Sequence, residues 1–164
     1  MHVVECCTSE VENAEVFNPY QKDYGSKNYL TASYLIEQFS ADDYNCKGAD
    51  VKTILNFDYP IIINGLFYIN EPLAFVDCDN IFFGPKAKVI IEPNGRLFIR
   101  SSSLSACGDE MWQGIETIGN LDQKSGLEIS KSCVQGTRPV IEDAERAIYL
   151  SENKILMADC ILHR

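Results

Sequence analysis

The feature that most constrains the fold of this chain is a cysteine that returns at nearly constant intervals. Four cysteines, each at the end of a short apolar segment, follow one another at intervals of 29, 26 and 27 residues: Cys78, Cys107, Cys133 and Cys160. Self-similarity at a period of about 20–50 residues is typical of repeat proteins, whose units bury apolar faces by stacking. Because free cysteine is among the most buried residue types, we expect the four thiols to point into one shared interior as structural residues.

Short β-branched and aromatic runs separated by turn residues begin after position 50. Examples are Ile61–Ile63 and Leu66–Ile69, with Asn64-Gly65 between them. Such runs are typical of strands. Three strands open from a glycine, and Leu97 and Leu150 each stand ten residues before a cysteine of the repeat. Equal offsets predict like side chains stacked on successive coils. The sequence therefore predicts an all-β solenoid of about four coils.

The first fifty residues lack this pattern of short strand-like runs. Leu30, Tyr34, Leu35 and Phe39 recur at helical spacing, which predicts a short amphipathic helix over residues 29–39. An open solenoid end exposes strand edges and apolar core, so we expect residues 1–50 to form an N-terminal cap and residues 51–164 to form the solenoid. The alternative is that the helix is a partner-binding surface.

Charge and hydropathy exclude some classes of function. The chain has 24 acidic and 14 basic residues and a formal net charge of −10. This balance repels polyphosphates, so we predict no binding to nucleic acid or to anionic membranes. No stretch approaches the ~20 apolar residues of a membrane helix, so no membrane insertion is expected. Residues 1–20 lack signal-peptide features, which predicts a cytoplasmic protein or part of a longer exported one.

Two features at the ends of the chain leave alternatives open. The chain has seven cysteines, so they cannot all pair within the chain, and their spacing is not that of a structural zinc site. Three alternatives stay open for Cys6, Cys7 and Cys46: a disulfide, a metal site or free thiols. The chain stops at Arg164, just after a strand-like phrase. We expect that edge to be covered by further coils of a longer protein or by a protein partner; the oligomeric state is left open.

One segment carries a family resemblance. It reads Ser-Leu-Ser-Ala-Cys-Gly-Asp-Glu-Met-Trp-Gln-Gly-Ile over residues 103–115, flanked by related phrases at 84–99 and 140–148. Residues 60–164 thereby resemble the right-handed parallel β-helix regions of Bacteroidota surface and secreted proteins, which are substrates of type IX secretion. The resemblance implies a right-handed coil and an extracellular or cell-surface location. It also implies architectural roles for Trp112, which would cover a coil corner, and for Gly114. The chain departs from the family in lacking a signal peptide and a sorting domain.

Parallel β-helices also host polysaccharide lyases and glycoside hydrolases, so acidic clusters are the candidates for chemistry. A lyase needs an acidic Ca²⁺ site and a basic residue. Asp77 and Asp79 flank one repeated cysteine, and Asp109 and Glu110 follow the next. Their near-equal offsets make the two pairs a candidate Ca²⁺ site on an outer face. Solvated turn carboxylates are the competing explanation, so no catalytic residue and no cofactor are assigned.

These patterns favour a structural or adhesive solenoid module without enzymatic activity. The alternative is a polysaccharide-active enzyme or carbohydrate-binding module of the same class. His2 and His163 have no nucleophile at motif spacing, which argues against a triad. The charged residues within 142–146 are expected to form a solvent-exposed corner with a local ion pair. The ligand is left open, with carbohydrate as one choice.

Overall fold

The computed structural model describes residues 11–19, 28–39, 53–118, 125–132 and 136–150, and the backbone of residues 154–157 and 161–162. This part of the chain is mostly β, with one short helix. The elements, in chain order, are β1 (Glu15–Phe17), β2 (Leu30–Thr31), α1 (Ala32–Phe39), β3 (Ile54–Leu55), β4 (Ile61–Ile63), β5 (Leu66–Ile69), β6 (Leu73–Val76), β7 (Ile81–Phe83), β8 (Lys88–Ile91), β9 (Arg96–Arg100), β10 (Ser103–Ala106), β11 (Gly114–Thr117), β12 (Gly126–Ser130), β13 (Val140–Ile141), β14 (Ile148–Leu150), β15 (Lys154–Met157) and β16 (Ile161–Leu162).

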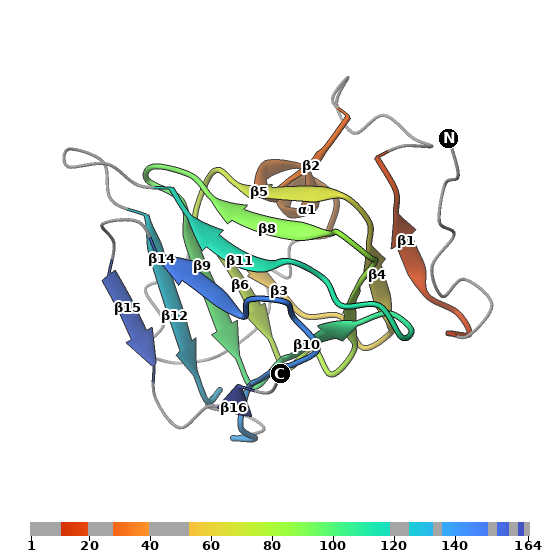
Figure 1. Cartoon of the computed structure of the whole chain (residues 1–164). Coiled ribbons are helices and arrows are strands. Elements are labelled where there is room, and N and C mark those ends of the chain that lie inside the picture. Colours follow the sequence, from red (N-terminus) through yellow and green to blue (C-terminus); the bar gives the residue numbers. More distant parts are fainter. Residues whose placement is uncertain are drawn as a thin grey trace.

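Three parallel sheets contain these strands, and the chain visits the sheets in rotation. Sheet A has the order β1-β4-β7-β10-β13-β16, sheet B has β14-β11-β8-β5-β2, and sheet C has β15-β12-β9-β6-β3. One passage through sheets A, B and C, which we call a round, therefore lays three strands beside the three before them. In Figure 1, β5, β8 and β11 run side by side in this way. The topology fits the predicted parallel β-solenoid in general form.

Alternating side chains divide each sheet into a buried and an outer face, since neighbours along a strand point to opposite sides. In sheet B the register aligns Leu30, Phe67, Val89 and Ile115, all of them buried. The residues after Phe67, Val89 and Ile115 lie on the other face and are only partly buried. The inward-facing side chains of all three sheets form one apolar cluster, which runs from Phe17 of β1 to Ile141 of β13. Burial of that surface, at about 25 cal/mol per Å², is the main stabilising contribution.

The cysteine interval does not mark equivalent positions, so the predicted thiol ladder is wrong for the two cysteines that the structure describes. Cys78 is a buried free thiol in the main core. The register Val76↔Arg100, continued two residues, places Ser102 opposite Cys78. Accordingly, the Cys78 N–H donates to Ser102 Oγ at 3.0 Å. Cys133 and Cys160 lie outside the described residues.

Cys107 lies on the opposite side of sheet A. It packs with Ile62 and Phe82 in a second cluster outside the main core, and it is disulfide-bonded. The register of β10 with β7 aligns it with Gly84 rather than with another cysteine. The physical reason is that rounds differ in length. In sheet A, equivalent positions are Ile61, Ile81, Leu104 and Ile141, so the spacing varies from 20 to 37 residues. A constant interval cannot stay in register with such rounds.

Two other sequence patterns have mixed outcomes. The glycines from which the three predicted strands open are Gly65, Gly95 and Gly126. Gly95 and Gly126 occupy neighbouring positions one round apart in sheet C, where the Gly126 N–H donates to the Gly95 carbonyl at 3.0 Å, whereas Gly65 precedes β5 of sheet B. The equal offsets of Leu97 and Leu150 were misleading, because Leu97 lies in β9 of sheet C and Leu150 in β14 of sheet B.

The predicted helix is present as α1, at the end of the sheets formed by β2 and β3. It begins at Ala32 because the two preceding residues form β2, and Thr31 Oγ1 accepts a hydrogen bond from the Tyr34 N–H at 3.3 Å. A hydroxyl in this role is typical of a helix N-terminus. Phe39 packs edge-on against Phe17 and Phe57 with ring centroids 5.7 and 5.5 Å apart. Strands β1 and β2 extend sheets A and B into the first fifty residues, where the sequence predicted a cap with a helix.

Candidate functional site

A buried tryptophan links successive rounds at the corner between β10 and β11. Trp112 is 0 % exposed and stacks on Phe83, with ring centroids 4.3 Å apart and an interplanar angle of 12°. Its Nε1–H donates to the Glu142 carbonyl at 2.9 Å, and its backbone pairs with Ala144 of the next round. Trp112 thus contacts the preceding round through Phe83 and the following round through Glu142 and Ala144. It anchors the segment that leads into β14.

A glycine beside this tryptophan allows two chain segments to approach closely. Gly114 has a φ of +94°, and a Cβ built on it would lie 1.7 Å from the Arg146 carbonyl oxygen. Side chains rarely adopt that backbone conformation, and the neighbouring carbonyl is backbone that cannot simply move aside. The next residue, Ile115, donates its N–H to the Ala147 carbonyl at 3.1 Å. Consequently, residues 145–147 lie against β11.

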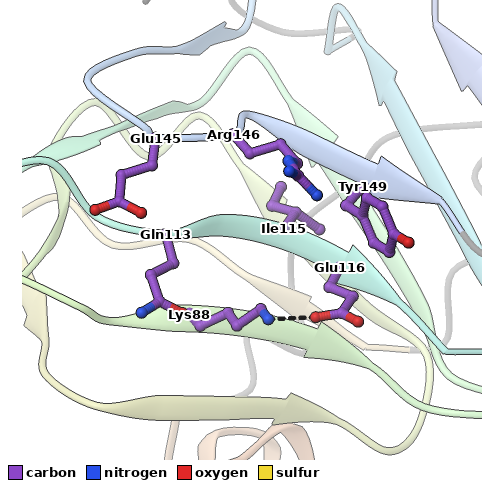
Figure 2. A pocket seen from close by; sticks show the side chains of 7 residues that line it. All are labelled: Lys88, Gln113, Ile115, Glu116, Glu145, Arg146 and Tyr149. Carbon is purple, nitrogen blue, oxygen red and sulfur yellow. Dashed lines mark ion pairs between the residues drawn. The ribbon is translucent and has the colours of Figure 1, made fainter.

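This approach borders a recess of about 410 Å³ on the outer face of sheet B, which we call the sheet B recess. Its lining comes from β8, from β11 and the residue before it, and from β14 and the corner before it, and comprises Lys88, Gln113, Ile115, Glu116, Glu145, Arg146 and Tyr149. Figure 2 shows Lys88 reaching toward Glu116 and Arg146 lying near Tyr149. The outward row of sheet B supplies Glu116 and Tyr149, which are register partners.

The charges of the sheet B recess are balanced and partly organised. Lys88 Nζ forms an ion pair with Glu116, and the Arg146 guanidinium lies over the Tyr149 ring, 4.9 Å from its centroid. Surface pairs of this kind, here between partly exposed side chains, contribute about 0–1 kcal/mol, so they orient side chains more than they stabilise the fold. Tyr149 is 45 % exposed. The recess therefore presents a ring face beside hydrogen-bond donors and acceptors.

The acidic pairs predicted from the sequence do not come together. Asp77 and Asp79 lie between β6 and β7, where the chain passes from sheet C to sheet A. Asp109 and Glu110 lie between β10 and β11, where it passes from sheet A to sheet B. The two candidate pairs therefore lie at different corners, because their expected equivalence depended on the cysteine interval. In the part of the chain that the structure describes, no group of three or more His, Cys, Asp or Glu is placed to hold a metal ion.

Asp77 and Asp79 instead line a smaller recess of about 220 Å³ at their own corner, which we call the corner recess. Its lining consists of Asn56, Phe57, Asp58, Tyr59, Asp77, Asp79 and Asn80. Asp77 is only 6 % exposed, and Ser132 Oγ donates a hydrogen bond to its Oδ1. Its Oδ2 is buried without a hydrogen-bond partner among the described residues. Burial raises the pKa of the Asp77 carboxyl, the charge of Asp79 raises it further, and the Ser132 hydrogen bond lowers it.

Sequence reasoning missed most of the residues that line the two recesses. Lys88, Glu116 and Tyr149 alternate with apolar neighbours, which signals an outward position, but strand pairing alone makes them adjacent. Arg146 was expected at a solvent-exposed corner with an ion pair, and in the structure its guanidinium covers the Tyr149 ring. The histidines His2 and His163 and the cysteines Cys6, Cys7 and Cys46 lie outside the described residues.

No protein-family model, curated protein or solved structure matches the chain. No helix in the described ranges is long and apolar enough to cross a membrane.

Proposed function

We propose that this chain is a structural or adhesive module without enzymatic activity, built as a right-handed parallel β-helix of about four coils with an N-terminal cap. The observation that carries the proposal is the single apolar core that extends from Phe17 to Ile141 through all three sheets. Such an interior serves stability, so ligands would meet the outer faces. The position of α1, packed on that core beside β2 and β3, supports the cap.

The same proposal includes an extracellular or cell-surface location. The disulfide at Cys107 supports it, because disulfides form and persist in oxidising compartments and are rare in the cytosol. Kinship with the β-helix regions of Bacteroidota type IX secretion substrates is also proposed, on the basis of the 103–115 segment. Further coils or a protein partner would cover the edge formed by β14, β15 and β16.

A carbohydrate-binding module is the second candidate, and the sheet B recess favours it. A ring face such as that of Tyr149 stacks on the C–H face of a sugar ring, while polar side chains around it hydrogen-bond to hydroxyls. Arg146 holds that ring from one side at 4.9 Å, and Gln113, Glu116 and Glu145 supply donors and acceptors nearby. This arrangement suits binding at a surface, which is also what an adhesive module requires.

A retention assay tests both candidates. The chain is passed over immobilised cellulose, chitin, pectin and alginate, and the eluate is analysed for new reducing ends and unsaturated uronates. We expect retention on at least one polysaccharide without product. Tyr149→Ala should lower retention, whereas Met111→Ala, which removes an exposed side chain outside the recess, should not.

Two results would contradict these proposals. Release of cleaved sugar by the wild-type chain would make it a polysaccharide-active enzyme and overturn the non-enzymatic assignment. Equal retention of the Tyr149→Ala and wild-type chains would remove the sheet B recess from the binding surface.

A further inference from the structure

We propose that the corner recess binds an organic cation, the guanidinium or ammonium group of a basic side chain presented by a partner peptide. This site is separate from the sheet B recess and does not depend on carbohydrate binding.

The first observation is the concentration of negative charge at this corner. Asp58, Asp77 and Asp79 line the recess, and Glu15 is close enough to act on Tyr59. No basic residue is among the described residues of the lining. The whole chain carries a formal charge of −10, which adds to the local field and attracts cations.

The second observation is the state of Asp77 itself. Among the lining residues, Asp77 and Phe57 are buried, at 6 % and 5 % exposure, whereas Asp58 and Asp79 are exposed. Asp77 therefore forms the deep side of the recess. One of its oxygens is taken by Ser132, and Oδ2 is buried without a partner in the described chain. A buried carboxylate oxygen left unpaired is costly, and a cation in the recess would compensate it.

The third observation separates an organic cation from a metal ion. Phe57 and Tyr59 line the recess together, with ring centroids 5.6 Å apart and an interplanar angle of 69°. Tyr59 is 38 % exposed, so a ring is available to a ligand. Aromatic rings beside carboxylates attract ammonium and guanidinium groups through the ring quadrupole. A hard metal ion prefers a shell of oxygen ligands, and the described residues hold no three-membered acidic group suited to one.

Binding is measured by NMR on the full chain in about 0.15 M salt, where the Debye length is about 8 Å, with three probes: acetyl-Gly-Arg-Gly-amide, acetyl-Gly-Gln-Gly-amide and Ca²⁺ alone. We expect the arginine peptide to shift backbone resonances of residues 56–59 and 77–80, and the glutamine peptide to leave them unchanged. Asp79→Asn should weaken binding of the arginine peptide about five-fold, the size of one exposed ion pair, and Asp77→Asn, which replaces the buried carboxylate, should weaken it at least as much.

The matched control is Asp109→Asn, which makes the same change of charge at the other corner. It should leave the affinity for the arginine peptide within two-fold of the wild-type value, since salt screens charges that lie more than a Debye length apart. Far-UV circular dichroism verifies that each variant is folded, and the Asp79→Asn variant keeps the test valid if Asp77→Asn unfolds.

Three outcomes would overturn the proposal. The first is equal binding of the arginine and glutamine peptides. The second is an equal loss of affinity in Asp109→Asn and Asp79→Asn, which would reduce the effect to net charge. The third is Ca²⁺ shifting residues 56–59 and 77–80 while the arginine peptide does not, which would make the recess a metal site.

Discussion

Replacing Trp112 with alanine removes the largest of the fully buried side chains and empties the corner between β10 and β11. Truncating a buried aromatic residue to alanine costs about 3–5 kcal/mol of unfolding free energy. The stack on Phe83 at 4.3 Å contributes about 0.5–1.5 kcal/mol within that loss. The Glu142 carbonyl also loses its donor, which adds about 1–3 kcal/mol if water does not replace it.

We therefore expect Trp112→Ala to lose about 5 kcal/mol, close to the whole stability of a marginal domain. Trp112→Phe separates the two contributions, because it keeps a ring for Phe83 and removes only the N–H donor and part of the volume. Its loss should be about 2 kcal/mol. The graded order, wild type above phenylalanine above alanine, follows from the contacts at this corner.

The measurement is urea unfolding followed by far-UV circular dichroism. Fluorescence is unsuitable for the comparison, since Trp112 is the single tryptophan of the chain. Met111→Ala is the matched control: Met111 is the preceding residue and is 43 % exposed, so its loss should stay within about 0.5 kcal/mol. A loss below about 1 kcal/mol for Trp112→Ala, or equal losses at both positions, would refute the assignment of Trp112 as an anchor between rounds.

Three further predictions concern single residues. Gly114→Ala should destabilise the chain by at least about 2 kcal/mol in urea unfolding, whereas Gly126→Ala, whose new Cβ would lie 3.5 Å from Arg96 Cγ, should cost less; equal losses would contradict the close approach. Burial raises the pKa of the Cys78 thiol to about 11, so at mildly alkaline pH a thiol-reactive aromatic disulfide should label Cys78 only after unfolding; rapid labelling of Cys78 itself in the native chain, located by peptide mass mapping, would contradict its burial. The raised pKa of Asp77, caused first by burial and then by Asp79, means that the folded state binds the proton more tightly than the unfolded state. Unfolding free energy should therefore rise as pH falls from the raised value toward the ordinary aspartate value, and Asp77→Asn should flatten this slope; parallel pH profiles of variant and wild type would refute it.

Local patterns predicted the strands well, because a strand depends on the alternation of its own side chains. The predicted runs Ile61–Ile63 and Leu66–Ile69, for example, are strands β4 and β5. The helix was also predicted from the spacing of its apolar residues, although β2 displaced its start to Ala32. In both cases the determining interactions are between residues a few positions apart.

Patterns that assumed a constant round length failed. The cysteine interval suggested that Cys78 and Cys107 are equivalent, and the two acidic pairs were placed together for the same reason. Register shows that Cys78 aligns with Ser102, and that Cys107 lies in the outer cluster of sheet A. Connections of unequal length are tolerated at corners, since loop closure becomes only slowly more costly with length. Spacing along the chain is therefore a poor measure of spacing across a sheet.

The recesses show the same division. The outward orientation of Glu116 and Tyr149 follows from alternation within a strand, so the sequence alone determined which side chains leave the core. Their adjacency, the ring beneath Arg146, and the buried Asp77 beside Tyr59 required the pairing of strands from different rounds. Burial of apolar faces selects which rounds stack and in which register, and that selection depends on the whole core rather than on any one segment. Element type was therefore a property of the sequence, and the sites were decided by tertiary structure.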